Sequence, residues 1–265
     1  MTFYPLFQIL NKMTEDTSRF YVIGTGLILG AFSILGSIFV IYNGLKIFRN
    51  RGSLSMALKF PVYIAFTDII ICIMVYVNQG YTLMTGKIVT GDLCGFFGSF
   101  YTIVAGVNMM LVTSFTCITL LLLHSYTVDL GKYDWRLWTT LIICMTIVSG
   151  FMFPYFGSDR YWCYLSSDST GLIVPIVSTS LVLLLFVVTI ILCILVIRQL
   201  KIIQKLQKEN TDKKKVIKAI ETKVTKKMLF YIVTYFIQWG FAIPYLSIPI
   251  TGYSEVKMVI FIMRI

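Results

Sequence analysis

The stretch RQLKIIQKLQKENTDKKKVIKAIETKVTKK, residues 198–227, decides how the fold is interpreted. It contains eleven Lys or Arg residues against three acidic residues, and it lies between two long apolar segments. Because Lys and Arg are retained on the cytoplasmic side during membrane insertion, this basic loop is predicted to lie in the cytosol. The direction of each flanking apolar segment follows from that placement.

The composition of the 265-residue chain is that of a membrane protein. It is 57% hydrophobic and 13% charged, whereas soluble domains contain about 25% charged residues. Apolar runs of about 20 residues are long enough to cross a hydrocarbon core of about 30 Å. A β-barrel is disfavoured because the runs are continuously apolar and do not alternate in polarity. We therefore expect an all-α membrane protein, a seven-transmembrane helical bundle forming a single transmembrane domain over residues 1–265.

Six complete spans and the start of a seventh are predicted. Residues 258–265 are too few to cross a bilayer, so the sequence predicts either a fragment of a longer chain or a natural six-helix product. The six spans are expected at residues 22–48, 58–77, 94–124, 137–155, 172–197 and 228–250, with a polar outer loop at 78–93.

The distribution of positive charge predicts the orientation. Loops predicted to be cytosolic contain 17 Lys and Arg residues, and those predicted to be outside contain five. Residues 1–20 are therefore expected outside the cell, with the protein in the plasma membrane. No cleavable signal peptide is recognised in them, so the first span is expected to act as the insertion signal. The net charge of +11 follows from this asymmetry and favours membrane lipids as partners, not nucleic acid.

Two of the six cysteines, Cys94 and Cys163, fall on the predicted outer side. An oxidising exterior permits a disulfide between them, which would tie the outer loop across the mouth of the bundle. Two unrelated thiols are the alternative. The other four cysteines lie inside apolar segments and are interpreted as small packing residues.

Asp68 is the single acidic residue inside a predicted span. An ionisable group at this depth costs about 2.5–3.5 kcal/mol on insertion scales, so it is expected to face the bundle interior and to have a partner or an ion. A sodium or water-network site is favoured, with Asn108 and Asn43 as possible neighbours. The alternative is a neutral Asp68 that is hydrogen-bonded to a neighbouring helix.

The sixth predicted span contains Trp239, Gly240 and Pro244. A proline inside a helix removes a backbone hydrogen bond and kinks the axis, so this span is predicted to pivot near Pro244, with Trp239 about one turn inside the kink. An ordinary proline distortion beside an interfacial aromatic is the alternative.

Aromatic residues gather toward the predicted outer half, where they are candidates for a ligand pocket. An aromatic belt at the membrane interface is the competing interpretation. The pocket candidates are Tyr101, Trp162, Tyr164 and Tyr245.

Signatures of catalysis are missing from the sequence. It contains no nucleophile paired with a base, no metal-ligand spacing, no Gly-rich phosphate loop and no paired carboxylates. We therefore expect no enzyme activity, no metal and no cofactor.

Five features follow one another along residues 20–265: Gly36-Ser37, Asp68, Cys94, Trp162-Cys163, and Gln238-Trp239 followed by Pro244. Their order and spacing resemble the G-protein-coupled receptor superfamily, most closely the cyclic AMP receptor-like group of slime moulds and fungi. The Asp-Arg-Tyr sequence of rhodopsin-like receptors is missing from the inner end of the third span, and the fourth span lacks a mid-helix Trp. The resemblance implies that Trp239 and Pro244 form the activation switch.

The resemblance implies a cell-surface receptor that binds an unknown extracellular ligand and signals to a heterotrimeric G protein through helix movement. Cyclic nucleotide, sugar, amino acid, peptide and lipid ligands all remain open. The residues implied to contact the G protein are Lys132, Arg136, Arg198, Lys201, Lys226 and Lys227.

A polytopic small-solute transporter is the alternative from another class. Transporters are often recognised by repeated halves or by helices broken at corresponding positions, and only the sixth span is clearly interrupted here. A retinal-binding photoreceptor is a third hypothesis, and it requires a Lys deep in the last helix. Lys257 falls at the outer edge of that helix.

Overall fold

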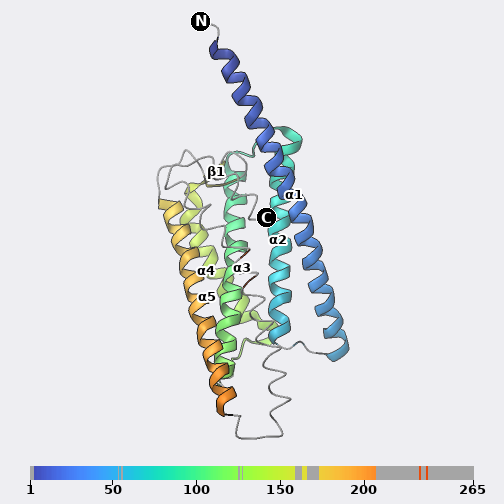
Figure 1. Cartoon of the computed structure of the whole chain (residues 1–265), viewed down its shortest axis with the longest axis vertical. Coiled ribbons are helices and arrows are strands. Elements are labelled where there is room, and N and C mark those ends of the chain that lie inside the picture. The colour runs from blue at the N-terminus through green and yellow to red at the C-terminus, as the bar shows by residue number, and fades with distance from the viewer. Residues whose placement is uncertain are drawn as a thin grey trace.

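The computed structural model is a mostly helical bundle (Figure 1). It describes residues 3–52, 54, 56–124, 126, 128–158, 163–165, 173–206, 233 and 237. Among these residues, five helices are long and apolar enough to cross a membrane. They are α1 (Phe3–Arg51), α2 (Met56–Thr85), α3 (Asp92–Leu123), α4 (Trp135–Met152) and α5 (Ile173–Leu206), with short 3-10 turns at Lys132–Asp134 and Phe153–Tyr155.

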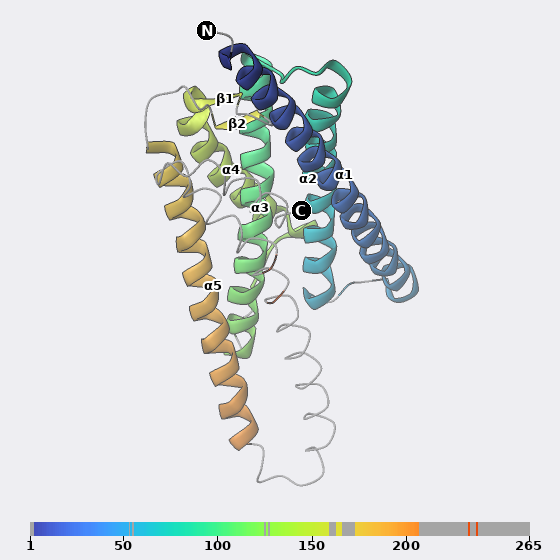
Figure 2. The same ribbon diagram turned by 45° about the horizontal axis from the view of Figure 1, so that its top comes forward.

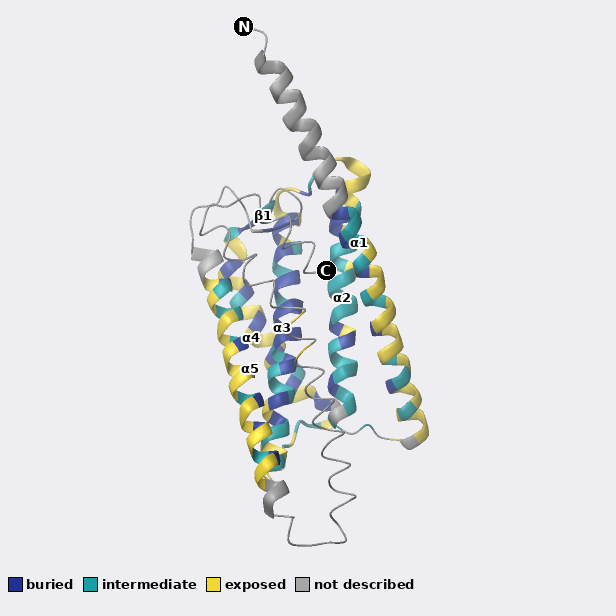
Figure 3. Cartoon of the chain, viewed as in Figure 1, coloured by how far each residue is buried: buried dark blue, intermediate teal, exposed yellow. Residues whose placement is uncertain are grey.

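Helix α3 is the centre of the bundle. It packs against α2, α4 and α5, while α1 packs on α2 (Figures 1 and 2). Half of its spanning window is buried, compared with 17–28% for the other four helices. Figure 3 shows the contrast, with α3 mostly buried and the outward faces of α1 and α5 mostly exposed. Exposed apolar side chains such as Phe32 and Phe39 on α1 are suited to lipid contact.

Small residues on α3 allow its neighbours to approach closely. A Cβ built at Gly98 would lie 3.0 Å from the ring of Phe156, and one at Gly106 would lie 2.7 Å from Met145 Sδ. Close approach of this kind increases van der Waals contact, which is the main force that associates helices in lipid. The core that results spans α2, α3 and α4 and consists of Phe60, Val107, Leu111, Ile118, Leu137, Leu141 and Met145.

Hydroxyl pairs join α3 to two neighbours. Ser99 and Ser149 lie 2.7 Å apart between α3 and α4. Thr113 and Thr189 lie 2.8 Å apart between α3 and α5. Such interhelical hydrogen bonds contribute about 0.6 kcal/mol each on average, so they direct the packing more than they drive it.

The loops lie at the two ends of the bundle. We call one the disulfide end: it contains the link at 86–91 and a two-stranded antiparallel hairpin, β1 (Phe156–Ser158) and β2 (Cys163–Leu165). We call the other the basic end: it contains the α1–α2 link, the α3–α4 link and the C-terminal end of α5 (Figure 1). Links predicted to share a side of the membrane therefore lie at the same end.

The predicted end of the second span is wrong. Helix α2 continues to Thr85, so residues 78–85 are helical and do not belong to the predicted polar loop. The helix accommodates its polar end because Asn78, Gln79 and Thr82 are buried, and it stops at Gly86, whose φ is +64°. The first span agrees with its prediction: the membrane-length segment of α1 is Ile23–Asn50, although the helix itself begins at Phe3. The membrane-length segment of α5, Val177–Ile202, lies a few residues beyond the predicted 172–197, and the helix continues to Leu206, into the basic loop.

The hairpin β1–β2 was not predicted. Its strands pair Phe156 with Leu165 and Ser158 with Cys163. Three-residue strands are too short to give a recognisable alternating pattern in sequence. The sixth span apart from Val233 and Ile237, the seventh-helix segment and most of the basic loop lie outside the described residues. Val233 and Ile237 are helical and exposed.

Candidate functional site

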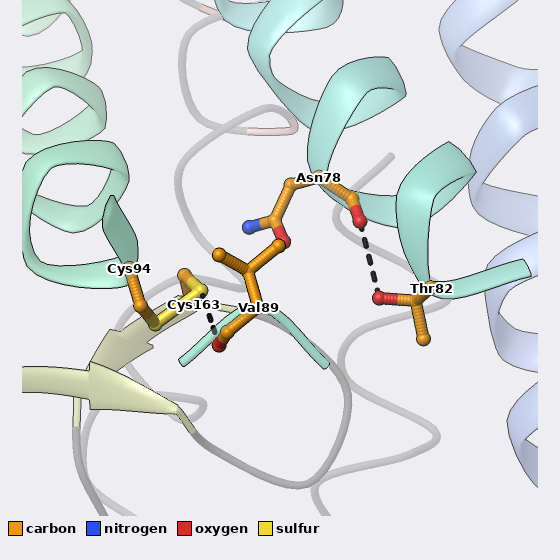
Figure 4. The surroundings of a disulfide bond; sticks show 5 residues. All are labelled: Asn78, Thr82, Val89, Cys94 and Cys163. Atoms are coloured by element: carbon orange, nitrogen blue, oxygen red, sulfur yellow. Dashed lines mark hydrogen bonds between the residues drawn. A yellow bond between two sulfur atoms is a disulfide. The ribbon is translucent and has the colours of Figure 1, made fainter. Parts of the chain in front are cut away.

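The predicted disulfide is confirmed at the disulfide end. Cys94 in the first turn of α3 is bonded to Cys163 of β2, with 5.1 Å between their Cα atoms. Both cysteines are buried beside Val89 (Figure 4). The Sγ atom of Cys163 lies 3.2 Å from the Val89 carbonyl oxygen, a sulfur–oxygen contact because a bridged sulfur has no proton to donate. The bridge thus fixes the hairpin and the α2–α3 link to the top of α3.

A cleft lies beside this bridge, between α2, α3 and β2. It is partly open to solvent, and its cavity volume is about 10 Å³, roughly the room that one water needs. Tyr101, one of the predicted pocket residues, lines it. Tyr164 packs on Tyr101 with ring centroids 5.6 Å apart, and it also contacts Phe156. The lining residues are Met74, Val75, Asn78, Phe97, Tyr101 and Cys163.

The polar end of α2, beside the cleft, contains two buried amide side chains. Asn78 is 4% exposed, and its Oδ1 atom is buried without a hydrogen-bond partner in the described part of the chain. The next residue, Gln79, is fully buried, and neither its Nε2 nor its Oε1 atom has a hydrogen-bond partner among the described residues. A buried polar atom left unsatisfied costs about 1–3 kcal/mol. Sequence reasoning missed both residues because it placed them in a solvent-exposed loop.

A second polar cluster lies halfway along the bundle and includes the predicted Asp68 and Asn108. The Nδ2 atom of Asn108 lies 2.9 Å from Asp68 Oδ1 and 2.8 Å from Thr67 Oγ1, so it donates to both. Asn108 is completely buried, and its Oδ1 has no partner among the described residues. The predicted neighbour Asn43 instead donates to its own helix, at the Phe39 carbonyl. The cluster joins α2 to α3.

The basic end contains a buried ion pair that was not predicted. Lys59 of α2 donates to both carboxylate oxygens of Asp134, at 2.8 and 3.1 Å, and the Tyr63 hydroxyl donates to Oδ2 at 2.6 Å. The Asp134 side chain is 5% exposed and that of Lys59 is 29% exposed. Trp138 of α4 packs edge-on against Tyr63, with centroids 5.3 Å apart. We call Lys59, Tyr63 and Asp134 the polar triad; it fastens α2 to the start of α4.

The predicted G-protein contacts that are described lie at the basic end. Lys132 is exposed in the link before α4, and Arg198 and Lys201 are exposed near the end of α5. Arg136 is exposed too, but it pairs with Asp129 at 2.7 Å. The other predicted residues, Trp162, Lys226, Lys227, Trp239, Pro244 and Tyr245, lie outside the described residues.

Comparison with known proteins gives no family. No protein-family model matches the chain, and no curated protein matches it. The chain therefore offers three features of its own: a small cleft beside the Cys94–Cys163 bridge at one end, exposed cations at the other, and polar contacts along α2 and α3 between them.

Proposed function

We propose that this protein is a G-protein-coupled cell-surface receptor in the plasma membrane, with an extracellular ligand at the disulfide end and a heterotrimeric G protein at the basic end. The observation that supports it most is the position of α3. This buried helix carries Cys94 beside the cleft at one end and packs against α5 along its length. A ligand in the cleft would therefore touch the helix that contacts most of the bundle.

The mechanism requires two bundle arrangements that a ligand distinguishes. A ligand shifts such an equilibrium only by its difference in affinity for the two states. The Asp68–Asn108 contact is a candidate for the element that differs, because no residue in the described part of the chain donates a hydrogen bond to Asn108 Oδ1. Water or a sodium ion bound at Asp68 would then stabilise one arrangement over the other.

The basic end supplies a surface of suitable charge. Lys132, Arg198 and Lys201 are exposed cations there, and positive surfaces speed association with acidic partners. The polar triad would hold the link that carries Lys132 in a fixed position relative to α2. The partner surface is thereby partly formed before the G protein arrives.

The test is nucleotide exchange on purified heterotrimers by the full chain in lipid nanodiscs. We expect basal GDP release above that of empty discs with at least one heterotrimer of a panel. The Arg198→Glu, Lys201→Glu double variant should lower it at least fivefold, because the sign of the surface charge is reversed. Binding to nucleotide-free heterotrimer is measured in parallel by co-purification.

Asp68→Asn separates signalling from folding. The substitution keeps the size of the side chain and its contact with Asn108 but removes the charge, so exchange and its dependence on sodium should change while thermal stability changes little. Asn43→Ala is the matched control, since Asn43 contacts only its own helix among the contacts of the described residues. Failure of every heterotrimer to bind or release GDP, together with solute uptake by vesicles, would favour the transporter instead.

A further inference from the structure

The cleft beside the Cys94–Cys163 bridge contains a hydrogen-bond acceptor that nothing in the described part of the chain satisfies. Asn78 lines the cleft, and its side chain lies beside Val89 and the bridge (Figure 4). Its buried Oδ1 has no partner among the described residues, while its backbone oxygen accepts from the Thr82 hydroxyl at 3.1 Å. Buried side-chain acceptors in native proteins are nearly always paired with protein, water or ligand. The partner missing here must be a donor.

No charged side chain lines the cleft among the residues that the structure describes. Its described lining side chains are apolar or aromatic apart from the Asn78 amide and the Tyr101 hydroxyl, and none carries a charge. The nearby charged residues Lys87 and Asp92 are exposed on the link and at the start of α3. An anion taken out of water requires a compensating cation, so a phosphate or carboxylate is not accommodated by these residues.

The size of the cleft restricts the group further. The cavity volume of the cleft is about 10 Å³, roughly the room that one water-sized group needs. The cleft therefore has room for one small group of a ligand and not for an entire nucleotide. Phe97 and Tyr101 provide flat apolar surface for the carbon atoms that carry that group.

We propose that the cleft binds an uncharged hydrogen-bond donor, the hydroxyl or primary amide of a ligand, with Asn78 Oδ1 as its acceptor. The proposal rests on the proposed function only in taking the disulfide end as the ligand-binding side. Among the ligand classes left open by the sequence, it favours neutral hydroxyl- or amide-bearing compounds over cyclic nucleotides for this cleft.

The experiment uses a cysteine reporter in the cleft of the full chain in nanodiscs. Val75→Cys places a thiol in the lining and keeps Asn78 intact. Hydroxyethyl, sulfonatoethyl and trimethylammonioethyl methanethiosulfonates, which are neutral, anionic and cationic, are compared by intact mass spectrometry. The labelling of the unsubstituted chain, which has free cysteines, is subtracted. Thr90→Cys, exposed on the link after Val89, is the matched control for intrinsic reagent reactivity.

We expect the neutral reagent to label Val75→Cys at least tenfold faster than either charged reagent, after normalisation to Thr90→Cys. Acetamide at 100 mM should slow this labelling at least twofold, whereas acetate, an anion of the same shape, should not. The protection by acetamide should disappear when Asn78→Leu is added to Val75→Cys.

Three results would overturn the proposal: equal normalised rates for the neutral and anionic reagents, protection that is the same for acetate or persists with Asn78→Leu, or no labelling of Val75→Cys by any reagent. Labelling requires no G protein. A chain that never activates a heterotrimer can therefore still give the expected pattern, and the two proposals fail separately.

Discussion

Asp134 is held at the basic end by two partners from another helix. Its backbone adopts φ +56°, in the left-handed region that non-glycine residues rarely occupy. Asp and Asn are the side chains that tolerate this region best. The Lys59 ammonium and the Tyr63 hydroxyl lie 2.8 and 2.6 Å from its carboxylate. Their interactions with this buried charge offset the cost of the left-handed backbone conformation.

Lys59→Met should destabilise the bundle more than loss of an exposed pair does. It leaves the Asp134 carboxylate buried with one neutral donor, and breaking a buried pair costs about 3–5 kcal/mol. Because 29% of the Lys59 side chain is exposed, we expect a smaller loss, about 1–3 kcal/mol. The measurement is chemical unfolding in detergent micelles followed by Trp fluorescence.

The control for this prediction is Arg136→Gln. Arg136 pairs with Asp129 at the same end, but the two side chains are 55% and 76% exposed, so the expected loss is about 0–1 kcal/mol. Asp134→Asn added to Lys59→Met should cost less than the sum of the two single changes, because the uncompensated charge is removed. Equal losses from Lys59→Met and Arg136→Gln would show that the triad is no more than a surface contact.

At this scale the sequence identified residues whose chemistry conflicts with their surroundings. A carboxylate in an apolar run, as at Asp68, predicts a polar partner. Of the two predicted neighbours, Asn108 contacts Asp68 in the structure. Lys59 and Asp134 gave no such signal because each falls at the edge of an apolar run, where charge is ordinary. They are 75 residues apart in sequence, and only the packing of α2 against the bundle brings them together.

The ends of a helix can be predicted from the length of its apolar run where the sequence changes abruptly from apolar to polar. Helix α3 lies within two residues of its prediction because Gly91 and His124 bracket a continuous apolar run. The end of α2 was mispredicted because polarity was taken to mean exposure. Asn78 and Gln79 are polar and buried, and a local sequence pattern does not reveal burial that depends on neighbouring helices.

Gly106→Val tests the close approach of α3 to α4. An added Cβ would overlap the buried side chain of Met145, which would have to move within a packed core. Overpacking of this kind costs about 1–3 kcal/mol, seen as a lower unfolding midpoint in the same micelles. Gly36→Val is the control, since a Cβ at Gly36 meets no atom within 4 Å. If both substitutions had equal effects, helix propensity and not packing would explain them.

On the scale of the whole molecule, the disulfide closes a loop that includes α3, α4 and the hairpin. The two cysteines are 69 residues apart in sequence, and a bridge across a long loop stabilises by about 2–4 kcal/mol. Cys94→Ser and Cys163→Ser should each reduce delivery to the cell surface several-fold, measured by surface biotinylation. Cys144→Ser, at an exposed free cysteine, should have no effect. Normal delivery of both bridge variants would contradict a structural role for the bond.

The orientation of the bundle in the membrane is the property on which the proposed function depends. Loops predicted to be cytosolic carry 17 Lys and Arg residues against five outside, an asymmetry that should retain the basic end inside. An epitope inserted after Thr90, in the exposed link at the disulfide end, should bind antibody on intact cells. One inserted after Tyr126, exposed in the α3–α4 link, should bind only after permeabilisation. The reverse pattern would put the cleft in the cytosol and the cations outside, which no receptor for an extracellular ligand and a cytosolic G protein could use.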